Sequence, residues 1–255
     1  MIATLLDRRA LRTEVLLVLG VSLGLSGIWA LVDFLGDLTT PGGLAAQSAH
    51  LNSSRAPGRP WLDLSKQLVA VLGALVPAFL ALHLLRQTGD ERRSVGLDGR
   101  RPWFDLRLGA LLAATIGGSG LALYLTARGL GANLTVVPTT LPAVWWRIPV
   151  LLLSAAENAF LEEVVVVGYL LRRLDQLGWS WRATLVASAL LRGSYHLYQG
   201  IGGFAGNVVM GVVFVLVYRR WGRVMPLFLA HTLIDSVAFV GYALLAGKVG
   251  WLPTG

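Results

Sequence analysis

Cysteine is absent from the 255-residue sequence, which excludes disulfide cross-links, thiolate zinc sites and catalysis by a cysteine nucleophile. Charged side chains are also scarce, at 14% of the chain, whereas a soluble domain carries roughly 25%. Hydrophobic residues make up 55%, and the mean hydropathy is +0.64. This composition predicts an integral membrane protein that is surrounded by the lipid bilayer.

Lysine is nearly absent as well, because 20 of the 22 basic residues are arginine. The formal net charge of +8 is compatible with nucleic-acid binding, but these arginines separate apolar runs and form no single patch. Membrane topology accounts for such a distribution. We therefore expect no nucleic-acid partner.

Seven apolar stretches are long enough, or nearly so, to span the hydrocarbon region, which takes about 20 residues of helix. Lipid requires every backbone group to be satisfied internally, and these stretches are too long for barrel strands. The predicted fold class is therefore an all-α integral membrane protein with about seven transmembrane helices. The stretches are residues 15–35, 67–85, 106–127, 148–171, 183–198, 204–218 and 224–246.

The distribution of the basic residues predicts how these helices are oriented in the membrane. With the N-terminus inside, fifteen of them fall in inner segments and six in outer ones, and the last, Arg192, lies within a helix. This bias predicts an inner N-terminus and an outer C-terminus. The connection 36–66, rich in Gly, Pro and Ser, is expected to be irregular on the outer face. The connection 86–107 carries both signs of charge and is expected to be solvated on the inner face.

The later stretches contain ionisable residues, although each charge at mid-bilayer costs about 2.5–3.5 kcal/mol. Several of these residues are four apart and therefore share a helix face. Lipid would turn these faces toward a common interior, so we expect the last four helices to form a polar-lined core bundle. The residues are Glu157, Asn158, Glu162 and Glu163 in the fourth stretch, Arg192 and His196 in the fifth, and His231 and Asp235 in the seventh.

Such a cluster suits hydrolysis. A carboxylate beside a neutral histidine can hold a water molecule and remove its proton. A second histidine with a hydrogen-bonding neighbour can stabilise an oxyanion. A membrane transporter or binding protein could use the same groups to bind a proton or a solute, and this alternative stays open.

Three short motifs carry a family resemblance. They are Glu162-Glu163-Val164-Val165-Val166-Val167-Gly168, Arg192-Gly193-Ser194-Tyr195-His196, and His231-Thr232-Leu233-Ile234-Asp235. Together they resemble the CPBP group of membrane peptidases, which includes the CAAX prenyl endopeptidases and the bacteriocin-immunity (Abi) proteins. The resemblance divides the chain into N-terminal helices and loops (1–141), a peptidase domain that forms the catalytic core bundle (142–246) and a C-terminal tail (247–255).

By this resemblance, Glu162 is the general base, assisted by His196, while His231 and Asp235 hold the oxyanion. Glu163 has a supporting role, and Asn158 lies one turn before Glu162. The family is often called a metalloprotease, and His196, His231 and Glu162 could supply three ligands to zinc. We favour the metal-free glutamate mechanism, with no cofactor. The implied substrate is a membrane-associated protein or peptide in a bacterial plasma membrane, and the oligomeric state is left open.

Two positions depart from the family pattern. Val167 stands where the first motif has arginine, and Arg192 stands where the second has an aromatic residue. We expect Arg192 to replace the missing arginine and to pair with Glu163; the alternative is a pseudoenzyme.

The remaining polar and aromatic residues receive simpler interpretations. Glu157 is expected to bond a neighbouring helix, and Ser194 is not expected to be a rhomboid-like nucleophile. Interfacial belts are expected to hold four aromatic residues, namely Tyr195, Tyr198, Trp145 and Trp146.

Overall fold

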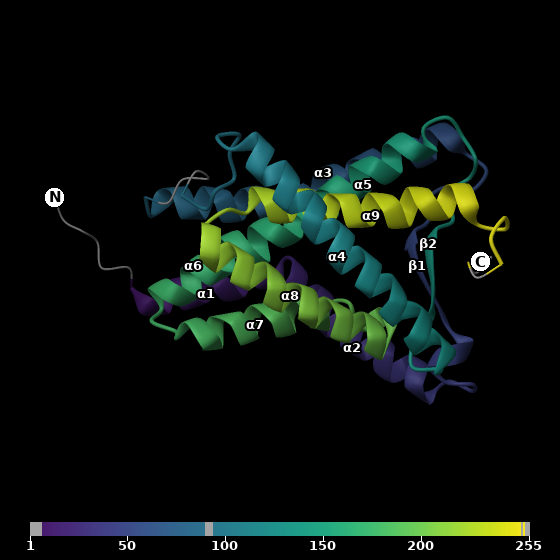
Figure 1. Cartoon of the computed structure of the whole chain (residues 1–255), viewed down its shortest axis with the longest axis horizontal. Helices are drawn as coiled ribbons and strands as arrows, with labels where there is room; N and C mark the ends of the chain where they lie inside the picture. Colours follow the sequence, from purple (N-terminus) through teal and green to yellow (C-terminus); the bar gives the residue numbers. More distant parts are fainter. Residues whose placement is uncertain (1–6, 90–93, 251, 253–255) are drawn as a thin grey trace.

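The chain folds into a bundle of α-helices with one small sheet, shown in Figure 1 for the computed structural model, which describes residues 7–89, 94–250 and 252. The α-helices are α1 (Arg8–Gly20), α2 (Leu23–Thr39), α3 (Pro60–Gln87), α4 (Pro102–Gly129), α5 (Arg147–Glu162), α6 (Leu170–Gln176), α7 (Trp181–Ser194), α8 (Ile201–Trp221) and α9 (Met225–Leu245). A π-helix, Glu163–Tyr169, joins α5 to α6 without interruption, and 3₁₀ turns occur at Leu44–Ala46 and Leu197–Gln199. Each of the seven predicted apolar stretches overlaps these helices, although α7 ends before the expected end of the stretch 183–198, and the all-α membrane fold is confirmed.

Within the described residues, four helices are individually long and apolar enough to cross a membrane, namely α3, α4, α8 and α9. Helices α1 and α2 form a fifth span if the two are taken together, although they meet at an angle of 52°. The helices α5 and α7 are shorter and more polar, and they carry Glu157, Glu162 and Arg192. The count of about seven transmembrane helices, which includes these two, stays a prediction.

The bend between α1 and α2 corrects the single straight helix expected over residues 15–35. Its cause is local: the Ser22 hydroxyl donates to the Val18 carbonyl, and a Cβ atom on Gly24 would lie 2.8 Å from the Leu19 carbonyl oxygen. Serine and glycine are common at sharp helix bends.

The outer connections are ordered, contrary to the expectation of an irregular 36–66 loop. Strand β1 (Ser48–Asn52) pairs in parallel with β2 (Thr135–Thr139), a segment from the far side of α4. Side chains at one end reinforce the pairing, since Asn52 donates to the Pro138 carbonyl at 3.0 Å and Thr139 donates to the Asn52 carbonyl at 3.1 Å. The sheet therefore fixes both connections against each other at one end of the bundle.

The inner connection is likewise less solvated than expected, although Arg92 and Arg93 lie outside the described residues. Arg223, between α8 and α9, is buried and donates to both carboxylate oxygens of Asp105 at 2.7 Å and to Asp98 at 3.0 Å. Backbone bonds run alongside, from Val224 to the Val95 carbonyl (3.0 Å) and from Met225 to the Gly96 carbonyl (3.2 Å). This segment is therefore clamped onto the turn that precedes α9.

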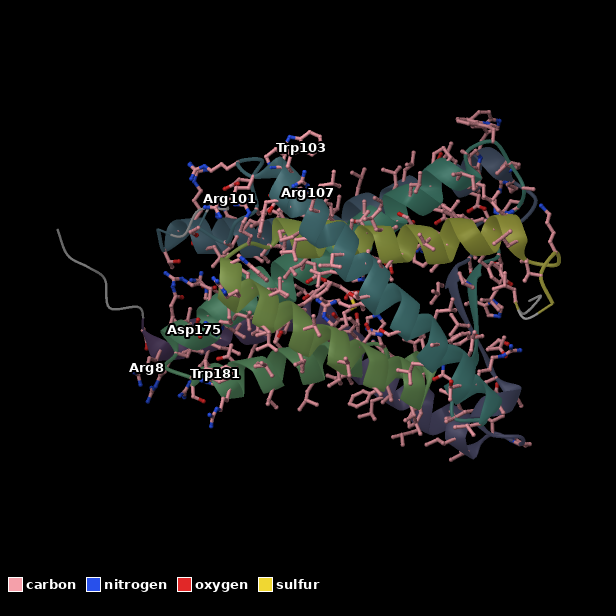
Figure 2. The ribbon with its side chains drawn as sticks, in the orientation of Figure 1. Arg8, Arg101, Trp103, Arg107, Asp175 and Trp181 are labelled. Carbon is pink, nitrogen blue, oxygen red and sulfur yellow. The ribbon has the colours of Figure 1, made fainter. Side chains whose placement is uncertain are left out.

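Other charged residues lie at the same end of the bundle, and the orientation of this end toward the inner side of the membrane stays a prediction. Figure 2 shows Arg8, Arg101, Asp175 and Trp181 gathered at the end of the bundle that carries the N-terminus. Arg173 is an exception because it is fully buried. Its guanidinium donates at 2.8 Å to four oxygens, those of Glu14, Thr88, Gln176 and the Leu84 carbonyl. Arg173 thus ties α1, α3 and α6 together.

The Arg223 clamp makes a measurable prediction about stability. Replacing Arg223 with Met leaves the buried Asp105 carboxylate without its partner, and breaking a buried pair costs about 3–5 kcal/mol. Asp98 keeps the backbone N–H of Arg100. The matched control is Arg219→Met, since Arg219 binds Asp175 with both side chains about one-third exposed; exposed pairs contribute about 1 kcal/mol or less. Equal losses in denaturant unfolding of the detergent-solubilised protein would contradict this account.

The same clamp predicts a dependence on pH. The backbone N–H of Arg100, together with Arg223, holds the pKa of Asp98 below its usual value. A lowered folded-state pKa contributes stability above the unfolded value of about 3.9, and this contribution is lost as the pH falls through the folded value. We expect Arg223→Met to remove the part of the acid-induced loss of stability that arises from the contact of Asp98 with Arg223, while the part due to Arg100 remains, as read from unfolding between pH 6 and pH 2.

Candidate active site

The two adjacent glutamates stand at a change of helix type. Glu162 is the last residue of α5, and Glu163 is the first of the π-helix, all of whose residues are buried. The π-helix contains four consecutive valines, whose branched Cβ atoms fit poorly into a regular helix. Wider π turns occur inside α-helices mostly at functional sites. Here the change of pitch brings both carboxylates to one cation.

That cation is Arg192, which is fully buried and lies near the end of α7. Its Nη2 lies 2.7 Å from Glu163 Oε1, and its Nη1 lies 3.1 Å from Glu162 Oε2. The pairing expected from the motif departures is therefore present. The Phe214 ring of α8 stacks on the guanidinium at 5.3 Å, and a Cβ atom on Gly211 would lie only 3.4 Å from Arg192 Cδ.

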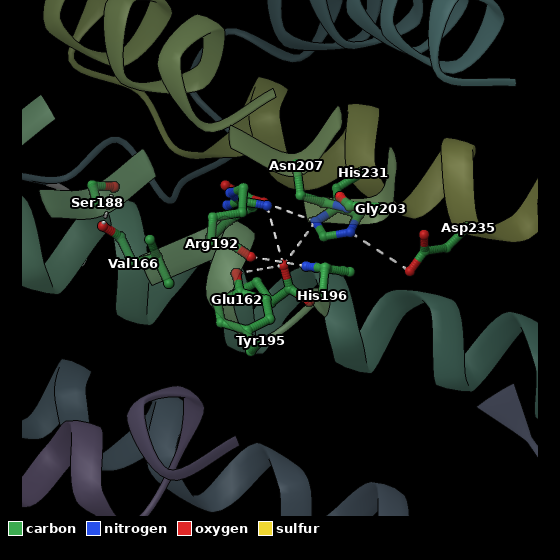
Figure 3. A network of polar contacts seen from close by, with 11 residues as sticks. Glu162, Val166, Ser188, Arg192, Tyr195, His196, Gly203, Asn207, His231 and Asp235 are labelled. Atoms are coloured by element: carbon green, nitrogen blue, oxygen red, sulfur yellow. Dashed lines mark hydrogen bonds and ion pairs between the residues drawn. The ribbon is translucent and has the colours of Figure 1, made fainter. Parts of the chain in front are cut away.

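His231 of α9 joins the glutamates from the other side. Its Nδ1 lies 2.8 Å from Glu163 Oε1 and 4.0 Å from Glu162 Oε2. Because a carboxylate accepts, we assign the Nδ1 proton to the bond with Glu163. The opposite nitrogen, Nε2, lies 3.6 Å from Asp235 Oδ2. One imidazole therefore lies between two carboxyl groups, as Figure 3 shows on the Asp235 side.

Tyr195 is the residue whose role the sequence did not reveal. The expectation of an interfacial position is wrong, since Tyr195 is 6% exposed and its hydroxyl donates to Glu162 Oε2 at 2.8 Å. A sequence signal was available, because Tyr195 lies three residues after Arg192 and therefore on the same helix face. The interfacial expectation also fails for Trp146, which is buried in the core, while Trp145 is exposed.

His196 reaches the site because α7 ends early. The helix stops at Ser194, and the chain turns through Leu197–Gln199 to Gly200, whose φ of +102° favours glycine. His196 Nδ1 lies 3.0 Å from the Arg192 carbonyl, and its ring stacks on Tyr195 with centroids 4.8 Å apart. Figure 3 shows this ring beside the Glu162 carboxylate. The carbonyl accepts, so Nδ1 carries the proton and Nε2 is left as an acceptor.

Three further candidates stay outside the hydrogen-bond network of the described residues. Asn158 is half-buried on α5 and makes no bond to the cluster. Glu157 was expected to bond a neighbouring helix, yet its Oε1 is buried without a hydrogen-bond partner. The Ser194 hydroxyl donates to the Leu191 carbonyl at 2.7 Å, so it is directed into its own helix.

The fit of a metal ion was tested on this geometry. Among the described residues, the group with ligand atoms within 4.8 Å of one another is Glu162, Glu163 and His231; the predicted zinc ligand His196 does not belong to it. The guanidinium of Arg192 already lies against both carboxylates of this group, and His231 Nδ1 donates to one of them. Glu163 Oε2 is left buried without a hydrogen-bond partner among the described residues. A metal ion bound to these carboxylates would nevertheless place a second positive charge beside the buried guanidinium, so these residues do not fit a metal ion.

Helices, buried carboxylates and imidazoles thus occur together where the three motifs lie, and a family comparison agrees with those motifs. Residues 144–237, from just before α5 into α9, match the family described as type II CAAX prenyl endopeptidase Rce1-like. This match supports the family assignment made from the motifs, and it covers the segment that carries all three of them. No curated protein and no solved structure matches the chain.

Glu157 and Glu163 are both buried on the same continuous run of helix, but only Glu163 takes part in the hydrogen-bond network. Glu157 therefore serves as the control for a test of Glu163. Glu163→Gln removes the charge that accepts from both Arg192 and His231, so we expect a loss of about 3 kcal/mol in unfolding free energy. Glu157→Gln changes a side chain whose Oε1 has no partner, and we expect a change within about 1 kcal/mol. Denaturant unfolding in detergent measures both variants. A Glu163→Gln variant as stable as the wild type would contradict the network.

Proposed function

We propose that this protein is an intramembrane endopeptidase of the glutamate type, which hydrolyses a peptide bond of a membrane-associated protein or peptide. The observation that supports it is the convergence of Glu162, His196 and His231 from separate helices on one buried cluster. Buried acids and bases with different partners are typical of sites that move protons. The proposed setting is a bacterial plasma membrane, with the N-terminus inside and the C-terminus outside.

Glu162 is the proposed general base. Arg192 and Tyr195 both donate to its Oε2, which fixes the carboxylate. No hydrogen bond from the described residues engages Oε1, so this oxygen can accept a proton from water, with His196 Nε2 as a second acceptor. The water oxygen then bonds to the carbonyl carbon of the substrate, and its proton passes to Glu162.

His231 and Asp235 form the proposed oxyanion site. Glu163 accepts the Nδ1 proton of His231, which orients the ring so that Nε2 faces Asp235. Donors to an oxyanion must carry hydrogen, so both Nε2 and the Asp235 carboxyl act in their protonated forms. The carbon–nitrogen bond then breaks, and the proton held by Glu162 moves to the leaving amine nitrogen.

The family name points to prenylated CAAX termini as one substrate class. The Ala-, Arg-, Gly- and Leu-rich composition suggests a GC-rich bacterium, in which prenylated CAAX proteins are not expected. The substrate class proposed here is therefore the broader one, a membrane protein or peptide whose scissile bond reaches the level of Glu162.

The central test of hydrolysis is Glu162→Gln, which keeps the size of the side chain but cannot accept the proton. A general base typically contributes about 10²- to 10⁴-fold, so we expect turnover to fall by at least 10²-fold. Quantitative proteomics of membranes from cells expressing wild type or variant should then show an uncleaved precursor that accumulates only with the variant.

Glu157→Gln is the control, because Glu157 is buried on the same helix outside the network. Membranes with Glu157→Gln should match the wild type. If Glu162→Gln left every membrane protein unchanged, hydrolysis would be refuted, and a loss of solute coupling in the same variant would point to a carrier.

Asp235 provides a second test, on the oxyanion site. Asparagine also offers a hydrogen to the oxyanion, and the family motif admits either residue, so Asp235→Asn should keep most of the activity. Asp235→Ala removes the donor and should cost about 10²-fold or more. Activity is read from the precursor that accumulates with Glu162→Gln. Equal activity of Asp235→Ala and Asp235→Asn would exclude Asp235 from the oxyanion site.

A further inference from the structure

The candidate site contains a cation that is permanently charged and fully enclosed. Arg192 is 0% exposed and contacts both motif glutamates. Phe214 of α8 covers the guanidinium, and Gly211 of the same helix lies beside the stem. Arginine is planar and stays ionised, which suits it to bridge two carboxylates.

The same carboxylates belong to the one group that could otherwise hold a metal ion among the described residues, the trio Glu162, Glu163 and His231. Arg192 and the His231 proton occupy two of its oxygens at 2.7–3.1 Å. A metal ion would have to displace a buried guanidinium from two buried carboxylates. Leaving such a charge unpaired costs about 3–5 kcal/mol.

The local packing explains how a residue of α7 comes to this position. Ser188, one turn before Arg192, donates to the Val166 carbonyl at 3.2 Å and so holds this face of α7 against the π-helix. Arg192, one turn further along α7, therefore also faces the π-helix. Val167 of the π-helix, where the family motif has arginine, is buried and contributes no charge.

We propose that Arg192 is the resident cation of this site: it positions Glu162 and Glu163, and it occupies the place where these carboxylates and His231 would otherwise bind a divalent metal. Arg192 is a positioning residue, since it acts on the reaction through Glu162. The inference deepens the proposed hydrolytic function by assigning its metal independence to one side chain.

The experiment is zinc binding by the purified full chain in detergent, measured without substrate as bound zinc per protein over a Zn²⁺ titration. We expect no stoichiometric site in the wild type. Arg192→Met keeps the stem without the charge and frees the trio, so it should bind one zinc at least about 100-fold more tightly, the equivalent of breaking a buried ion pair. Adding Glu163→Gln to Arg192→Met should abolish this site.

Arg173→Met is the matched control, because Arg173 is also fully buried but lies outside the trio; it should gain no zinc. If Arg192→Met does not fold, Arg192→Lys replaces it: an ammonium reproduces the bidentate fork poorly, and zinc affinity should rise by at least about tenfold.

Stoichiometric zinc in the wild type that Glu163→Gln abolishes would overturn the proposal, and so would unchanged affinity in the folded Arg192 variant. Because zinc binding is measured without turnover, this failure is separate from that of hydrolysis, which the Glu162→Gln proteomics decides.

Discussion

The structure depends on neutralising the buried carboxylates of Glu162 and Glu163, because lipid cannot solvate an ionised group as water does. Glu162 and Glu163 are 8% and 0% exposed, and an ionised group buried in this way must be paired. Arg192 supplies the charge, while Tyr195 and His231 supply further hydrogen bonds. The pairing has a cost, because the guanidinium must itself be covered. Phe214 and Gly211 of α8 provide that cover, so a helix with no ionisable residue in the cluster takes part in the site.

The same solution recurs at the inner end of the bundle, where the function is structural. Arg173 joins α1, α3 and α6, and Arg223 fastens the connection before α4 to the turn before α9. Both are buried arginines that donate to several oxygen acceptors. They hold the helices that carry the site, whereas Arg192 belongs to the site itself. A count of arginines along the sequence assigns Arg173 and Arg223 to topology, but their burial shows that both also serve in packing.

Sequence patterns predicted the helices well because apolar length and backbone satisfaction in lipid leave few alternatives. The motif spacing also predicted the contact between Arg192 and Glu163. Other features depend on contacts between distant segments, and no local pattern encodes them. The pairing of Ser48–Asn52 with Thr135–Thr139 is one such feature, and the burial of Tyr195 depends on α7 ending at Ser194. The roles of Glu162, His196, His231 and Asp235 in hydrolysis remain predictions, as does the domain boundary at residue 142.

The most direct measurement of the central claim is a double-mutant cycle between Arg192 and Glu163 on unfolding free energy. Arg192→Met and Glu163→Gln remove the two sides of one buried contact of 2.7 Å. We predict that the double variant is more stable than the sum of the single losses implies, by about 1.5 kcal/mol or more. Additivity within about 0.5 kcal/mol would show that the two side chains do not interact in the folded protein, and would contradict the account.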